Sequence, residues 1–272
     1  MGSSTSSNMA SSCDAIDQKI EKMIYYPPTT DRKLFNLLNT DISSLVLLNT
    51  KSNDVVPVVL VYPNRSRIVD KYIVFSHGNG SDIYGMFELF KIWSKTYDVC
   101  VVGYDYVGYG LSKISQPSEE KCYDSMETTM EYVLSNLCSD KKKIFLIGQS
   151  LGTGMTIDYA SKNAWTTPIA LISPYKSICR VVVDTSLLSL VDKFKSYNKL
   201  DKIKCQIKIF HGEADDLIKI SHSITIYNYL KKKSLALDPV WFKQTGHNDI
   251  LQKMIAQPKY LEEILNTYTE LI

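Results

Sequence analysis

The chain has 272 residues, 44% of them hydrophobic, and its 31 Lys and Arg against 29 Asp and Glu leave a net charge of +2. This length suits one large domain or two small ones, and the near-neutral balance gives no reason to expect nucleic acid as a partner. No apolar stretch reaches the roughly 18 residues of a transmembrane helix.

The N-terminal residues are mostly Ser, Thr and Gly, which predicts a flexible tail over residues 1–20 and no signal peptide. Met1-Gly2 followed by Ser6 matches the pattern for N-myristoylation, so Gly2 is a candidate lipidation site. One acyl chain binds membranes only marginally, and Cys13 would supply a second, palmitoyl signal. The alternative is a Ser-rich tail without this role.

The six cysteines include no C-x-x-C pair, so neither a metal site nor a disulfide framework is expected. Cys100 and Cys205 fall in or beside strand-like runs and are interpreted as small buried hydrophobic residues. Free thiols fit a reduced, cytoplasmic environment. No cofactor motif is present either, since Gly78 and Gly80 form no G-x-G-x-x-G and no Walker sequence occurs.

Strand-like and helical stretches alternate along the chain. Two runs close together, 44–49 and 55–62, suit an antiparallel pair, and six further strands are expected at 71–76, 97–105, 142–148, 167–173, 206–212 and 238–244. Helical periodicity predicts helices over Ile83–Lys95, Cys122–Leu137, Leu151–Asn163, Ser221–Lys232 and Tyr260–Ile272. This alternation predicts one α/β domain over residues 21–272, with eight strands in a mostly parallel sheet and helices on both faces.

The sequence "GQSLG", Gly148 to Gly152, fits G-x-S-x-G and follows a buried strand. A serine on a tight strand-to-helix turn adopts strained backbone angles and needs small neighbours. In α/β-hydrolases this serine is the nucleophile, and the helix that follows presents N–H groups to a developing anion. Ser150 is therefore the candidate nucleophile, although a plain Gly-rich turn would look the same in isolation.

The base and the acid of such a site follow the serine in the order Ser, Asp or Glu, His. The chain has four histidines: His77 precedes Ser150, His211 ends a strand, and His222 falls in a helical stretch expected to be exposed. His247 lies in the loop after the last strand and is the candidate base.

The acid is expected in the loop after the penultimate strand, where "GEADD" offers Glu213, Asp215 and Asp216. Asp215 is preferred and Asp216 is the alternative, because sequence reasoning alone separates them poorly. An oxyanion hole needs two N–H donors. The expected donors are the backbone N–H groups of Leu151, directly after the nucleophile, and of Asn79, in the loop after the third strand.

Six stretches, "FSHGNGSDI", "YDYVGYGLS", "GQSLGTGMTIDYAS", "SPYKS", "HGEADDLI" and "TGHNDI", resemble the α/β-hydrolase domain-containing protein 17 family over nearly the whole chain. The resemblance implies the α/β-hydrolase fold and a serine hydrolase that removes palmitoyl groups from S-acylated protein substrates at the cytosolic membrane surface. By motif position it implies Ser150 as nucleophile, Asp215 as acid and His247 as base. Animal members carry an N-terminal cysteine cluster, whereas this chain has Cys13 alone there.

Two other functions remain open at this stage. A carboxylesterase or monoacylglycerol-type lipase would use the same triad, and a non-enzymatic binding protein could share the fold. The segment from Ser177 to Val191 lies where caps are often inserted, and it would either line a groove for the acyl chain or pack as a core helix.

Overall fold

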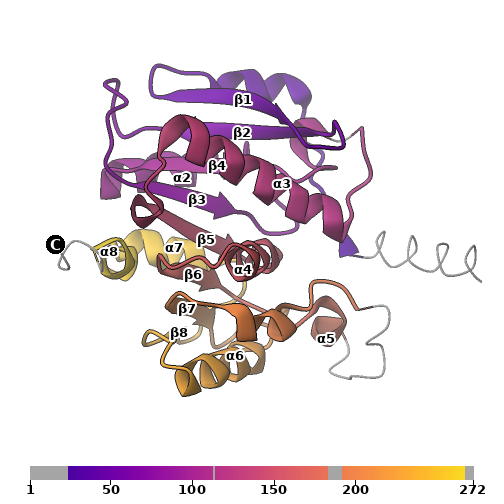
Figure 1. Ribbon diagram of the computed structural model, residues 1–272, viewed down its shortest axis with the longest axis vertical. Coiled ribbons are helices and arrows are strands. Elements are labelled where there is room, and N and C mark those ends of the chain that lie inside the picture. Colours follow the sequence, from indigo (N-terminus) through magenta and orange to yellow (C-terminus); the bar gives the residue numbers. More distant parts are fainter. Residues whose placement is uncertain (1–23, 113, 183–191, 267–272) are drawn as a thin grey trace, which may run out of the picture.

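Eight strands form one sheet in the order β1-β2-β4-β3-β5-β6-β7-β8 (Figure 1). The computed structural model describes residues 24–112, 114–182 and 192–266. All eight expected strands are present: β1 (Ser43–Asn49), β2 (Val55–Val61), β3 (Tyr72–Ser76), β4 (Cys100–Tyr104), β5 (Ile144–Gln149), β6 (Ile169–Ile172), β7 (Ile207–Gly212) and β8 (Val240–Phe242).

The pairing confirms a mostly parallel sheet with an antiparallel pair at its start. Strand β2 runs antiparallel to both β1 and β4, and every later pair, from β4·β3 to β7·β8, is parallel. Parallel strands require crossover connections, and the helices between the strands provide them.

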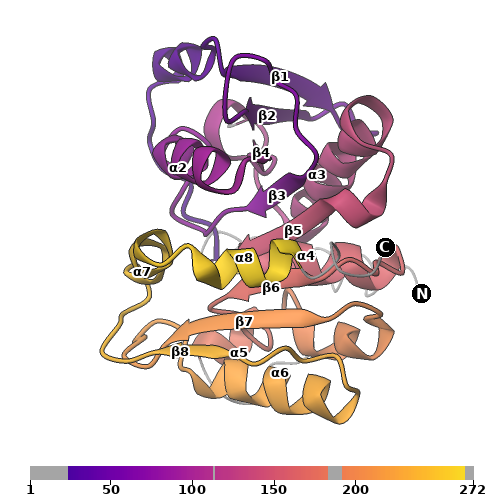
Figure 2. The ribbon, with the colours of Figure 1, turned by 90° about the vertical axis from the view of Figure 1, so that its left-hand side faces the viewer.

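Helices cover both faces of the sheet, as Figures 1 and 2 show. One face carries α3 (Glu119–Tyr132), α4 (Gly152–Lys162), α6 (Ser221–Lys232) and the short α5 (Ile178–Val182); the other carries α2 (Phe87–Tyr97), α7 (Ile250–Ala256) and α8 (Lys259–Asn266). Shorter helical turns are η1 (Arg32–Leu38), η2 (Gly110–Ser112), η3 (Val133–Leu137), η4 (Lys141–Lys143) and η5 (Ser196–Lys202).

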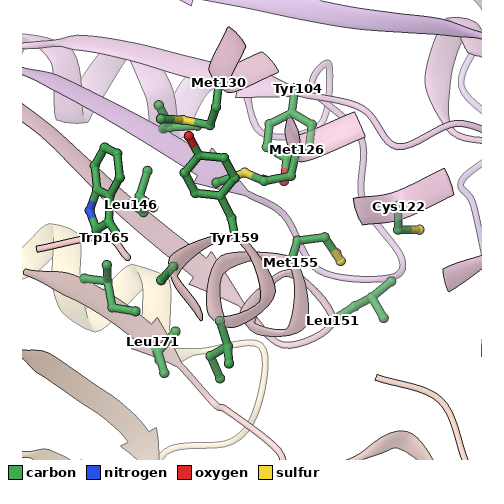
Figure 3. Close-up of a cluster of buried hydrophobic side chains, with 14 of the residues drawn as sticks. Tyr104, Cys122, Met126, Met130, Leu146, Leu151, Met155, Tyr159, Trp165 and Leu171 are labelled. Carbon is green, nitrogen blue, oxygen red and sulfur yellow. The ribbon is translucent and has the colours of Figure 1, made fainter. Parts of the chain in front are cut away.

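The strands supply side chains to two hydrophobic cores by strict alternation. In β2, Val58 and Leu60 belong to the core under α3 and α4, whereas Val59 and Val61 belong to the core under α2 and α8. Successive side chains of a strand point to opposite faces, so a strand buried on both sides is apolar throughout. Figure 3 shows part of the first core, where methionines of α3 and α4 meet strand side chains such as Tyr104 and Leu146.

Several helix ends differ from the sequence-based expectation. The helix expected from Ile83 begins only at Phe87, because Ile83 N–H donates to Asp105 and residues 83–86 form a turn. Helix α3 begins earlier than expected, at Glu119, because the Ser118 hydroxyl caps the N–H of Lys121 at 3.2 Å.

The C-terminal helix expected over Tyr260–Ile272 begins one residue earlier, as α8 at Lys259, and residues 267–272 lie outside the described ranges. A further helix, α7, precedes it. Pro258 separates the two, since the residue before a proline is disfavoured in helical conformation. Within the described ranges, no helix combines the length and apolar character needed to cross a bilayer.

Two glycines allow the first turn of α4 to lie directly against the ends of β3 and β5. A Cβ on Gly152 would lie 2.0 Å from the carbonyl oxygen of Ser76, and one on Gly148 would lie 2.6 Å from the carbonyl oxygen of Gly152. These are backbone atoms of packed elements, so no side-chain rotation relieves the clash. The first turn of α4 therefore depends on the absence of a side chain at these positions.

We expect Gly152→Ala to lower the free energy of unfolding by about 2 kcal/mol, within the usual range for overpacking. Helix propensity alone would give the opposite sign, because alanine is the better helix former. Gly80→Ala is the matched control, since a Cβ there meets nothing within 4 Å. Urea denaturation of both variants measures the difference, and a Gly152→Ala protein as stable as the wild type would contradict this packing.

Candidate active site

The candidate site lies at the carboxyl edge of the parallel strands, where ligand sites of open α/β sheets form. Strands β3 and β5 are neighbours with Ser76 opposite Gly148, so the loops that follow them emerge side by side. The first loop carries Asn79 and the second carries Ser150 and Leu151. A Cβ on Gly78 would lie 3.7 Å from the Cβ of Ser150, which places the two loops in contact.

Ser150 occupies a strained turn between β5 and α4. Its φ is 50°, in the left-handed region that non-glycine residues rarely adopt. Its N–H donates to the carbonyl of Ile172 at 2.8 Å, and its own carbonyl accepts from the N–H and hydroxyl of Thr153 at 3.0 and 2.7 Å. The surrounding hydrogen bonds thus hold the serine in this conformation, as strain at functional sites requires.

Ser150, His247 and Asp215 form one chain of hydrogen bonds. The Nε2 atom of His247 lies 3.0 Å from Ser150 Oγ, and its Nδ1 atom lies 2.7 Å from Asp215 Oδ2. Because the carboxylate can only accept, Nδ1 carries the proton in neutral His247, and Nε2 is then free to accept the serine proton. All three side chains are at most 8% exposed. The arrangement can deprotonate the serine as it attacks an electrophile.

Asp215, and not Asp216, faces His247. Asp216 and Glu213 are exposed, whereas Asp215 Oδ1 accepts from the N–H groups of Leu217 and Ile218 at 3.1 and 2.8 Å. These two bonds fix the orientation of the carboxylate. The conformation of this loop therefore selects Asp215 over Asp216 as the acid.

Two residues that the sequence analysis did not select also contact the Asp215 carboxylate. The Ser173 hydroxyl donates to Oδ2 at 3.0 Å, from a backbone with φ 51°. The Nε2 atom of His211 lies 3.3 Å from the same oxygen and 2.8 Å from the carbonyl of Ile218. The only sequence signal for them was their place at the ends of β6 and β7.

The surroundings of Asp215 set its ionisation. Burial alone would raise the pKa of this carboxyl, but hydrogen bonds from His211 and His247 and from the backbone favour the charged form more strongly. The net effect holds the pKa of Asp215 below its usual range. The carboxylate is therefore ionised at neutral pH and can stabilise a positive charge on His247.

One expectation about the other histidines was wrong. His222 was expected on an exposed stretch, but it is 4% exposed and its Nδ1 accepts from the N–H of Lys176 at 3.2 Å. It lies on the face of α6 that packs against the sheet, beside Ser223 and Ile226. Short helices with mixed polar residues give a weak periodicity, which explains the error.

Three tyrosines of the stretch "GYDYVGYG" tether the loop that carries Asn79. This loop contains the second predicted oxyanion donor, so its position matters for any reaction at Ser150. Each hydroxyl contacts a different residue at or after the end of β3. Tyr104 Oη lies 2.6 Å from Ser76 Oγ, Tyr106 Oη donates to the His77 carbonyl at 2.5 Å, and Tyr109 Oη donates to Asn79 Oδ1 at 2.5 Å.

A buried histidine–aspartate pair supports the same loop. His77 Nε2 lies 3.3 Å from Asp105 Oδ1, and both side chains are at most 1% exposed. Burial raises the pKa of Asp105, partly offset by His77. Asp105 Oδ1 also accepts from Ile83 N–H at 2.8 Å, so the pair ties the start and the end of the loop together.

Other expectations from the sequence concern residues away from the triad, and some of these lie outside the described residues. The lipidation candidates Gly2 and Cys13 lie outside them. Of the segment from Ser177 to Val191, the structure describes only residues 177–182, in which Ile178 and Val181 pack against the first core. Cys100 and Cys205 are at most 1% exposed, which confirms their interpretation as buried residues.

The low pKa of Asp215 predicts how stability depends on pH. A carboxyl in the unfolded chain titrates near about pH 4, so the ionised Asp215 stabilises the fold above that pH and this contribution is lost as the pH falls through the folded-state pKa. The difference in unfolding free energy between wild type and Asp215→Asn should therefore narrow below about pH 4. Asp216→Asn removes the same charge at an exposed position and should show no comparable change. Urea denaturation across this range is the measurement, and an Asp215→Asn difference independent of pH would contradict it.

Comparison with known proteins gives a consistent family assignment. Residues 109–253 match the Dienelactone hydrolase family. The chain is 49% identical over 242 residues to "Putative alpha/beta hydrolase L404" of Acanthamoeba polyphaga mimivirus, covering 89% of this chain and 91% of that protein. It is 33% identical over 193 residues to human alpha/beta hydrolase domain-containing protein 17C, covering 71% of this chain and 56% of the human protein.

Solved structures agree on the fold. A Pyrococcus furiosus esterase superposes with a TM-score of 0.68 at 16% identity, covering 89% of this chain and all of that chain (100%). Mouse alpha/beta hydrolase domain-containing protein 10 superposes with a TM-score of 0.55 at 14% identity, covering 81% of this chain and 98% of that one. Together with the eight-stranded sheet, these matches show that the chain is an α/β hydrolase of the Dienelactone hydrolase family, homologous to the alpha/beta hydrolase domain-containing proteins 17.

Proposed function

We propose that this hydrolase is a serine hydrolase that cleaves fatty acyl thioesters from protein cysteines. The observation that carries the proposal is the unbroken hydrogen-bonded chain from Asp215 through His247 to Ser150 at the turn before α4. Homology to the alpha/beta hydrolase domain-containing proteins 17 supports a hydrolase activity. The preference for a palmitoyl thioester rests on the resemblance of the six sequence stretches to that family.

Acylation would begin with the attack of Ser150 Oγ on the thioester carbonyl carbon. His247 Nε2 takes the hydroxyl proton as the new C–O bond forms, and Asp215 stabilises the resulting imidazolium. The carbonyl oxygen becomes an oxyanion, for which the N–H groups of Leu151 and Asn79 are the proposed donors. The C–S bond then breaks, and the departing cysteine sulfur takes its proton from His247.

Deacylation would repeat these steps with water. His247 removes a proton from the water as its oxygen attacks the acyl-Ser150 carbonyl, and the same two N–H groups hold the second oxyanion. The bond to Ser150 Oγ breaks, the serine recovers its proton, and the fatty acid leaves. No step needs a metal or an organic cofactor, because the three side chains and two N–H groups supply every proton transfer and all of the charge stabilisation.

We expect Ser150→Ala to lower kcat for a palmitoyl-thioester peptide by at least about 10⁴-fold, as loss of a serine nucleophile does. A fluorophosphonate probe should label the wild type and not this variant. The control is Asp216→Asn, which changes an exposed carboxylate next to Asp215. This variant should retain normal turnover and labelling. A Ser150→Ala protein with full activity would overturn the triad.

The same assay run with a monoacylglycerol decides the acyl acceptor. Turnover of the thioester peptide well above that of the monoacylglycerol supports the proposal. The reverse ranking makes the protein a lipase or carboxylesterase with the same triad, and absence of both turnover and labelling would favour a binding protein.

We further propose that the enzyme works at the cytosolic surface of a membrane, held by acyl groups on Gly2 and Cys13. The support is the myristoylation pattern at the N-terminus together with a nearby cysteine. Protein produced in a eukaryotic host should show the added acyl mass by intact mass spectrometry, and Gly2→Ala should abolish the myristoyl increment. An unmodified Gly2 in the wild-type protein would refute this attachment.

A further inference from the structure

The described chain begins with a segment that lies across the loop carrying Asn79. Residues Ile24 to Thr30, here named the strap, contact this loop at two points. The Nδ2 atom of Asn79 donates to the carbonyl of Ile24 at 2.5 Å, and the N–H of Tyr26 donates to Asn79 Oδ1 at 2.9 Å. Farther along, the Thr30 hydroxyl donates to Asp82 Oδ2 at 2.5 Å.

The side-chain amide of Asn79 has little freedom left. An amide oxygen has two acceptor sites, and here one accepts from Tyr26 N–H and the other from the Tyr109 hydroxyl at 2.5 Å. The amide nitrogen is held by Ile24. Three bonds from two separate segments therefore fix one side chain, and with it the backbone to which it is attached.

The strap is itself anchored in the core. Ile24 and Tyr25 are 7% and 6% exposed, and the Tyr25 ring packs edge-on against Phe194, with 6.2 Å between ring centroids. Tyr26, in contrast, is 63% exposed, so it acts on Asn79 through its backbone N–H and not through its ring. The strap is thus anchored by the buried side chains of Ile24 and Tyr25, and the backbone N–H of Tyr26 then holds Asn79.

The backbone N–H of Asn79 is available for a ligand. Among the described residues, neither this N–H nor that of Leu151 has a hydrogen-bond acceptor in the protein. Such donors work because they are held in place before the reaction, and a misplacement of about 1 Å can cost as much as 100-fold in rate.

We propose that the strap and Tyr109 are positioning elements for the oxyanion hole, holding the Asn79 N–H where the oxyanion forms. The proposal rests on the proposed serine-hydrolase function of Ser150. It assigns a role in the reaction to residues whose hydrogen bonds reach Asn79 and not the triad. The strap acts through main-chain groups of Ile24 and Tyr26, which explains why no sequence motif marks it.

Two substitutions at Tyr26 separate the effect of its backbone hydrogen bond to Asn79 from the effect of its side chain. Tyr26→Pro and Tyr26→Ala both remove the same exposed ring, but only proline also removes the N–H that Asn79 accepts. For a short p-nitrophenyl ester we expect Tyr26→Pro to lower kcat about tenfold with KM within about twofold of wild type. Tyr26→Ala should keep wild-type kcat and KM.

Tyr109→Phe tests the second tether independently. It removes one hydroxyl and keeps the ring that packs against His77 and Tyr106. We expect a loss in kcat similar to that of Tyr26→Pro.

A trifluoromethyl ketone tests the oxyanion hole by inhibition. Ser150 Oγ adds to its carbonyl carbon, His247 takes the proton, and the ketone oxygen becomes an oxyanion in the hole. In both tether variants the inhibition constant should rise by the same factor by which kcat/KM falls.

Three results would overturn the proposal: equal kcat values for Tyr26→Pro and Tyr26→Ala, a rise in KM at unchanged kcat, or a lower melting temperature with no loss of kcat. The rate of Ser150 labelling by a fluorophosphonate replaces kcat if ester turnover is slow. The Ser150→Ala variant distinguishes failure of the strap proposal from failure of the proposed function, because esterase activity retained in this variant would refute the triad. A preference for another acyl acceptor does not affect the test of the strap, which uses a short ester.

Discussion

The close approach of α4 to the end of β3 is the constraint on which the site depends. Gly152 lies so near the Ser76 carbonyl that any side chain would collide with it. This contact brings the loop after β3 beside Ser150, and it forces the chain between β5 and α4 into a turn with φ 50° at the serine. A wider turn would relieve the strain, but it would separate the nucleophile from the N–H groups proposed to stabilise its product.

Around this contact, one set of loops orients the acid and base, and another set of contacts holds the loop after β3. The loops after β6 and β7 and the end of β7 itself orient the acid Asp215, through Ser173, the backbone at Ile218 and His211. Asp215 in turn orients His247, which lies in the loop after β8. The end of β3 and the loop that follows it are held by hydrogen bonds from the strap and from the three tyrosines. Most of these hydrogen bonds are buried or partly buried, which makes them costly to break. The bond from Tyr26 N–H to Asn79 Oδ1 is exposed, and it depends on the buried anchor at Ile24 and Tyr25 beside it.

Much of this arrangement was predictable from local pattern. Apolar strand runs alternating with amphipathic helices predicted the sheet, since the two periodicities differ and both faces had to be covered. The G-x-S-x-G motif predicted the turn at Ser150. The order of nucleophile, acid and base along the chain predicted His247 in the loop after the last strand. Helix ends were less predictable, because caps and turns such as Ser118 and Ile83 depend on single hydrogen bonds.

What the sequence alone determined is the set of elements and the candidate residues, because periodicity and turn chemistry are local properties of the chain. It did not separate Asp215 from Asp216, which are adjacent and chemically identical; only the fold of their loop turns one toward His247 and the other to solvent. Nor did it reveal the strap, because Asn79 and Tyr26 are 53 positions apart and joined through a backbone N–H. Contacts made by the main chain leave no trace in side-chain identity, so only the tertiary structure decided them.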